Sequence, residues 1–177
     1  MKSKLLTFIL WVSTDFPASH PRAGEKTNFP EKILNGTGKP FSVFGFDDLN
    51  PCINEEKIHT CRKNYPLWKA RIEAILQGKA ILSIRYWKLK GGRYTKGNRQ
   101  IEICQLDKNS GIGIQKIENA AYSNRNIPEV WRIEDNYFNT NKISFNDGLS
   151  LKDFQDWFKN YDLSKPLAII HFTPYRY

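Results

Sequence analysis

Lys57-Ile58-His59-Thr60-Cys61-Arg62 is the stretch around which we interpret the rest of the sequence. It combines two cations, an imidazole, a hydroxyl and a thiol. A regular strand would alternate these side chains between two faces and bury a charge on either face. A turn or a bent strand end would instead let Lys57, Thr60 and Arg62 converge on one point. Such a cluster suits an anion, a carbonyl or a polar base edge.

The segment resembles the signature of the ASCH family, a group of small domains with the PUA-like fold, usually written G-x-K-x-x-E/T-x-R. Lys57, Thr60 and Arg62 occupy the Lys, Thr and Arg positions, and Glu55 stands where the family has glycine. Residues 146–154 and 169–172 resemble the acidic turn, helix and last strand of ASCH domains. The chain resembles uncharacterised bacterial or phage members most closely. The resemblance implies an α+β fold, a PUA-like mixed β-barrel with two or three flanking helices, formed as one domain by residues 1–177.

One branch of the ASCH group removes an acyl group from N4-acetylated cytidine, and the resemblance implies a Lys-x-x-Thr pair with a distant carboxylate. Lys57 and Thr60 match the pair, and Asp147 stands where that branch has a glutamate. As a hypothesis, Thr60 acts as the nucleophile or positions a water, and Lys57 relays the proton. Asp147 orients the lysine or protonates the leaving amine. Arg62 holds the base carbonyl or stabilises the oxyanion.

Composition favours a single basic domain. The 177 residues are 40% hydrophobic, with 11 Phe, 8 Tyr and 5 Trp, which is enough for a packed core. The formal net charge of +9 favours a polyanionic partner through its field and through counterion release. A basic but inert surface explains the same charge, so composition alone leaves both interpretations open.

A dense group of cations lies at residues 88–99, which we expect to form a hairpin-like loop with flexible glycine turns. The group contains no acidic residue, and aromatic residues are interleaved with it. Cations beside aromatics can hold phosphates while the rings stack on bases. A solvated, mobile hairpin is the competing interpretation, and we favour nucleic-acid contact. The candidate ligand contacts are His59, Arg62, Trp68, Trp87, Lys88, Lys90, Arg93, Tyr94, Lys96 and Arg99.

Three classes of function follow. The first is binding of nucleic acid or a nucleotide, such as RNA or a modified base, without chemistry on it. The second is an amidohydrolase acting on N4-acylated cytidine-type nucleosides through Lys57, Thr60 and Asp147. The third is a structural or partner-binding domain in which 57–62 is an exposed strand end and His59 and His171 are ordinary core or rim residues. We adopt the first and keep the second as its alternative.

Neither a metal nor a cofactor is expected, because the three histidines are far apart and no metal-ligand spacing occurs. The three cysteines form no C-x-x-C pair, which fits a reduced, cytoplasmic setting. The apolar run at 5–12 superficially looks like a signal peptide, but we favour a first buried strand. No run has the length of a transmembrane helix, so we expect no membrane association.

Hydrophobic periodicity and turn residues predict the remaining elements. An inserted surface loop is expected at 37–56, where three phenylalanines pin the loop to the body or contact a ligand. Residues 137–144 are predicted to be irregular. Ser150 and Asp153 are predicted to form a capping box at the start of a helix. The other helices are expected at 25–34, ending at Asn35-Gly36, and at 64–77. Strands are expected at 5–12, 80–87, 100–106, 112–117, 130–133 and 167–172.

Overall fold

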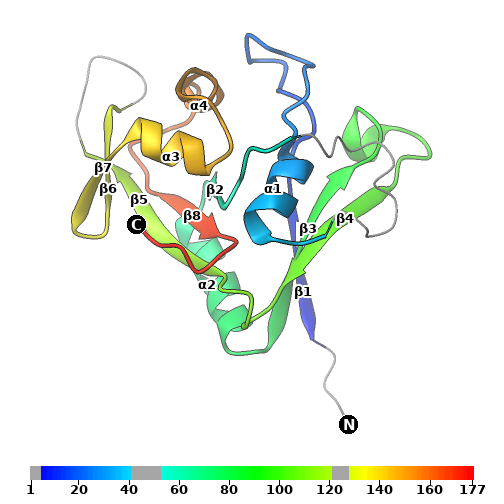
Figure 1. Ribbon diagram of the computed structural model, residues 1–177, viewed down its shortest axis with the longest axis horizontal. Helices are drawn as coiled ribbons and strands as arrows, with labels where there is room; N and C mark the ends of the chain where they lie inside the picture. The colour runs from blue at the N-terminus through cyan, green and yellow to red at the C-terminus, as the bar shows by residue number, and fades with distance from the viewer. Residues whose placement is uncertain (1–4, 41–52, 121–127) are drawn as a thin grey trace.

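The computed structural model describes residues 5–40, 53–120 and 128–177. Within these ranges the chain forms four α-helices and eight β-strands, and the strands make two sheets (Figure 1). The expected α+β class is therefore confirmed for the described part of the chain. Most of the expected insertion, with its three phenylalanines, lies outside the described residues.

The first sheet joins the start of the chain to its middle. Its first strand pairs in parallel with the strand expected at 80–87, and the pairing ends with Trp11 opposite Arg85. Trp11 and Trp87 consequently lie next to each other at one end of the sheet. The strands expected at 80–87 and 100–106 are confirmed with the same bounds. The sheet has the order β1 (Leu6–Trp11), β3 (Ala80–Trp87), β4 (Gln100–Leu106).

The second sheet is antiparallel and contains the signature stretch. We expected a turn or a bent strand end there, but His59–Arg62 forms a regular strand that pairs His59 with His171. The strand is tolerated because Lys57, just before it, is paired with a buried carboxylate rather than left alone. The sheet has the order β2 (His59–Arg62), β8 (Leu167–His171), β5 (Gly113–Asn119), β6 (Val130–Ile133), β7 (Asn136–Asn139).

Two helices begin at caps that the sequence predicts. The Asn64 side chain accepts a hydrogen bond from the Leu67 amide at the start of α2 (Tyr65–Leu76). Ser150 accepts from the Asp153 amide at the start of α4 (Leu151–Phe158) and donates to the Asp153 carboxylate. Both caps satisfy amides that the first turn of a helix leaves without partners.

Two expectations about helices were wrong. Helix α1 (Phe29–Thr37) continues past Asn35-Gly36 and ends at Gly38, whose φ of 64° suits a residue without Cβ. Residues 137–144, expected to be irregular, contain β7 and helix α3 (Thr140–Asn146). Helix α3 is stabilised by the Asn139 side chain, which accepts from the Lys142 amide at its first turn.

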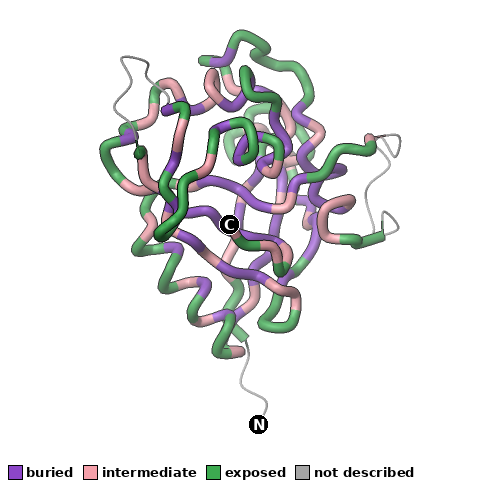
Figure 2. Tube along the Cα trace, turned by 60° about the vertical axis from the view of Figure 1, so that its left-hand side comes forward, coloured by how far each residue is buried: buried purple, intermediate pink, exposed green. Residues whose placement is uncertain are grey.

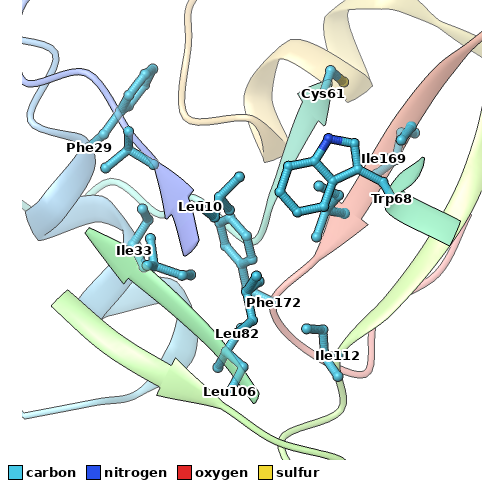
Figure 3. Close-up of a cluster of buried hydrophobic side chains, with 14 of the residues drawn as sticks. Leu10, Phe29, Ile33, Cys61, Trp68, Leu82, Leu106, Ile112, Ile169 and Phe172 are labelled. Atoms are coloured by element: carbon cyan, nitrogen blue, oxygen red, sulfur yellow. The ribbon is translucent and has the colours of Figure 1, made fainter. Parts of the chain in front are cut away.

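The core lies between the two sheets and beneath the helices. Figure 1 shows α1 between the sheets, and α2 contacts strands of both. The buried stretches of the trace run through the strands in the interior (Figure 2). In the close-up, Leu10 and Leu82 of the first sheet face Phe172, which follows β8 (Figure 3). One continuous apolar core therefore fixes the two sheets against each other.

Candidate functional site

Lys57 and Asp147 meet in the interior. The Lys57 amine donates to Asp147 Oδ1 at 2.5 Å and to the Asp147 backbone carbonyl at 2.5 Å. Lys57 is 1% exposed and Asp147 3% exposed. Gly148 makes this approach possible, because a Cβ at that position would lie 3.0 Å from Lys57 Cβ. The φ of Gly148, 71°, also disfavours residues other than glycine. Lys57 and Asp147, two residues that the resemblance assigns to one site, are therefore in contact.

Burial sets the electrostatics of this pair. Burial lowers the pKa of the Lys57 amine, and the nearby Arg62 charge lowers it further, whereas Asp147 opposes both effects. Burial likewise raises the pKa of the Asp147 carboxyl, and Lys57 opposes that shift. Each partner therefore opposes the shift towards the neutral form that burial causes in the other.

His59 extends the pair into a buried polar cluster. Its Nδ1 lies 3.7 Å from Asp147 Oδ1, and its Nε2 is 2.7 Å from the Tyr177 hydroxyl. Asn146 also donates to that hydroxyl, at 3.0 Å. Burial lowers the pKa of His59 well below its usual range. Within the part of the chain that the structure describes, His59 Nδ1 and both ring nitrogens of His171 are buried without a hydrogen-bond partner.

Thr60 and Arg62 lie on the other face of β2, since side chains alternate along a strand. Thr60 is buried, with 5% of its surface exposed. The Arg62 guanidinium donates through Nη2 to the Trp11 carbonyl at 2.5 Å. Burial lowers the pKa of Arg62, and its Nε has no hydrogen-bond partner among the described residues. The structure therefore brings Lys57, His59 and Asp147 together and directs Arg62 elsewhere.

Arg62 lines a cavity of about 630 Å³ that we call the tryptophan cavity. Its walls come from three separate parts of the chain. The Trp11 and Trp87 rings stack within it, with centroids 5.0 Å apart and planes 8° from parallel. The lining residues are Trp11, Val12, Ser13, Thr14, Asp15, Phe16, Pro17, Ala18, Arg62, Trp87, Leu89, Lys90, Gly91 and Gly92.

Charge in the tryptophan cavity is mainly positive. Arg62 and Lys90 both line it, and Asp15 contributes a carboxylate. That carboxylate is paired with Lys26, whose amine lies 3.1 Å from Asp15 Oδ1. The Lys90 amine reaches across to the loop after β1, where it lies 3.5 Å from the position a Cβ of Gly24 would occupy. An anionic group in the cavity would thus meet cations from two sides.

The wall at Lys90 continues into residues 88–99, which we call the basic hairpin. A short 3₁₀ turn, η1 (Gly92–Tyr94), lies within it. Tyr94 is 82% exposed, and the Arg93 guanidinium lies 4.8 Å from its ring centroid. In the described part of the chain, no carboxylate forms an ion pair with Lys90, Arg93, Lys96 or Arg99.

Trp68 and His59, two of the predicted ligand contacts, are buried away from the tryptophan cavity. Trp68, expected to be able to stack on a base, is 8% exposed and packs in the core beside Cys61 and Ile169 (Figure 3). The reason is its place on the apolar side of α2, where the Arg71 guanidinium covers the ring at 4.8 Å. His59, expected to contact a ligand, is fully buried under Tyr177.

Sequence reasoning missed Trp11, Tyr177 and Asn146. Trp11 was part of an apolar run that predicts a buried strand, and its position as the last residue of that strand was the available signal. Tyr177 and Asn146 carry no motif, and their contacts depend on strand pairing that only the fold reveals.

Three further findings concern metal binding, membrane spans and similarity to known proteins. Across 5–40, 53–120 and 128–177, no three His, Cys, Asp or Glu side chains are grouped so that they could hold a metal ion. No helix in those ranges has the length and apolarity needed to cross a bilayer. No family model, curated protein or solved structure matches this chain.

Proposed function

We propose that this protein binds nucleic acid or a nucleotide and holds one base in the tryptophan cavity. The observation that carries the proposal is the combination of stacked Trp11 and Trp87 rings with Arg62 and Lys90 in one hollow of about 630 Å³. Its volume falls in the range of about 300–1,000 Å³ typical of ligand sites. Indole faces stack on any base, and the cations suit a phosphate or a base carbonyl.

Arg62 would supply the polar recognition. One of its N–H groups is held by the Trp11 carbonyl, which fixes the guanidinium beside the aromatic pair. Its Nε has no partner among the described residues. A guanidinium with spare donors pairs well with a phosphate or a carbonyl oxygen. Because Nε is itself buried, a bound nucleotide would pair with the Arg62 N–H groups that face the cavity.

The relation to ASCH domains and their PUA-like barrel belongs to the same proposal. The contact between Lys57 and Asp147, two residues that the resemblance assigns to one site, supports it. The functional proposal does not depend on this relation, because the tryptophan cavity involves residues outside the signature apart from Arg62.

Equilibrium binding to the four ribonucleoside monophosphates and to short oligonucleotides tests the proposal. We expect Trp87→Ala to weaken binding roughly 5- to 150-fold, which corresponds to about 1–3 kcal/mol per stacked base. Tyr137→Ala is the matched control, since Tyr137 is an exposed aromatic (66%) on the second sheet. Absence of binding by the unmodified protein, or equal losses in the two variants, would remove the proposal.

A second candidate is the amidohydrolase, and the Lys57–Asp147 contact is the observation that favours it. Lys57, Thr60 and Asp147 are at most 5% exposed, so a substrate could reach them only after covering residues move. The assay is incubation with N4-acetylcytidine and related N-acyl nucleosides. Thr60→Val, which keeps the shape and loses the hydroxyl, is the control. Release of acid no faster than in Thr60→Val would rule the activity out.

A further inference from the structure

The basic hairpin presents a second aromatic surface beside the tryptophan cavity. Gly92 lines the cavity, and Tyr94 follows two residues later in the same 3₁₀ turn. Such a turn rises about 2 Å per residue, so the Tyr94 backbone lies only about 4 Å along the turn from Gly92. Its ring is almost fully exposed. An exposed ring at that position can stack on a base next to the one in the cavity.

The conformation of the hairpin is fixed by its own side chains. Asn98 accepts from the Leu89 amide at 2.7 Å and donates to the Leu89 carbonyl at 2.7 Å and to the Gly92 carbonyl at 2.9 Å. The Thr95 hydroxyl donates to the Lys90 carbonyl at 2.6 Å. These bonds tie the two arms together on either side of Tyr94. The surface is therefore organised before a ligand arrives, which lowers the entropic cost of binding.

Four cations of this surface have no carboxylate partner among the residues that the structure describes. Lys90, Arg93, Lys96 and Arg99 form no ion pair with a carboxylate in the described ranges, whereas Arg85 on the adjoining strand is paired with Glu102. A single nucleotide in the cavity would leave most of these cations without a phosphate to contact. A chain of phosphates passing along the hairpin would meet several of them in succession.

We infer that the ligand is a single strand of RNA or DNA, with one base in the tryptophan cavity and a neighbouring base on Tyr94, while the backbone crosses the basic hairpin. This inference rests on the proposed function and narrows it. A mononucleotide cannot reach both aromatic surfaces. A duplex cannot place a base in the cavity without first unpairing and unstacking it.

The test compares four ligands on four proteins. The ligands are a ribonucleoside monophosphate, single-stranded RNA and DNA of about eight nucleotides, within the usual range for single-strand sites, and a duplex of equal length. The proteins are the unmodified chain, Trp87→Ala, Tyr94→Ala and the matched control for Tyr94→Ala, which is Tyr137→Ala. Both tyrosines are exposed, Tyr94 in the turn η1 and Tyr137 on β7 of the second sheet, so neither change is expected to affect folding.

We expect at least one single strand to bind about tenfold or more tightly than the monophosphate and the duplex. Tyr94→Ala should weaken that binding roughly 5- to 150-fold and leave the monophosphate affinity unchanged. Tyr137→Ala should change neither. A preference for RNA or for DNA identifies the source of the strand and supports the inference.

The inference is overturned if the monophosphate or the duplex binds as tightly as the strand, or if Tyr94→Ala behaves like its control. In those cases monophosphate binding that depends on Trp87 still supports the proposed function. If Trp87→Ala leaves every affinity unchanged, the proposed function fails as well. The two failures are thus distinguishable in one set of titrations.

Discussion

Lys57 and Asp147, ninety positions apart in the sequence, are in direct contact, with 2.5 Å between Nζ and Oδ1. The contact joins Lys57, two residues before β2, to Asp147, the C-cap residue of α3. Removing either partner would leave a charge in a place without water. The pair therefore fixes the relative positions of two segments while contributing little net stability of its own.

We expect Asp147→Ala to lower the free energy of unfolding by about 3–5 kcal/mol, because the Lys57 amine would remain buried without its carboxylate. Urea denaturation measures the change. The double variant Lys57→Met/Asp147→Leu is the informative control, since it removes both charges and should recover most of the loss. A single variant as stable as the unmodified protein would contradict this account of the pair.

Tyr177 closes the polar cluster, and its hydroxyl is the group that matters. Tyr177→Phe removes the bonds to His59 and Asn146 while keeping the ring. We expect a loss of about 1–2 kcal/mol in the free energy of unfolding, because a buried His59 nitrogen loses its partner. Tyr137→Phe, on an exposed ring, should change it by less than about 0.5 kcal/mol. Equal effects would show that the Tyr177 hydroxyl contributes nothing.

The burial of His171 is expected to make the stability of the protein depend on pH. Burial, with a smaller effect of the Arg176 charge, lowers the pKa of His171 from 6.5 to about 3. The groups around its ring are His59, Tyr175, Tyr177 and Arg176. Between those two pH values the unfolded chain binds a proton at this position and the folded protein does not.

The contribution of neutral His171 to the free energy of unfolding is therefore fully present above pH 6.5. It falls as the pH drops towards 3. One such group changes the free energy of unfolding by up to about 1.4 kcal/mol per pH unit. We expect His171→Phe to reduce the slope of the free energy of unfolding against pH, below pH 6.5, by up to that amount. Chemical denaturation at several pH values measures it, and an unchanged slope would contradict the assignment.

The basic hairpin predicts a dependence of binding on salt. For single strands, each phosphate contact contributes about −0.7 to the slope of log K against log salt concentration. Lys96→Ala should make the slope of strand binding shallower by about that amount. Lys165→Ala is the control, because Lys165 is an exposed lysine that pairs with Asp162. Binding that ignores ionic strength would exclude phosphate contacts at the hairpin.

Much of the local structure follows from the sequence. Residues 80–87 are rich in β-formers and bounded by Gly78 and the basic hairpin, and β3 has the predicted bounds. Ser150 with Asp153 specifies the start of α4 by reciprocal hydrogen bonds that need no distant partner. Such elements are predictable because neighbouring residues determine them.

Other parts depend on distant contacts and were not predictable. The segment around α3 is rich in Asn and lacks a clear apolar period, yet Thr140 accepts a hydrogen bond from the Trp131 indole at 2.9 Å, which anchors the helix to β6. Likewise, Trp11 joins the tryptophan cavity only because β1 pairs in parallel with β3. Pairings between distant strands are decided by the whole core, so the motif located Arg62 but not the aromatic pair beside it.

The most direct test of the central claim observes the tryptophans while a ligand binds. The indole N–H signals of the five tryptophans can be followed by NMR during titration with a single-stranded oligonucleotide. We predict that the Trp11 and Trp87 signals shift in proportion to saturation, while the signal of Trp131, buried in the core, stays in place. Saturable binding that leaves Trp11 and Trp87 unmoved would contradict the claim that a base occupies the tryptophan cavity.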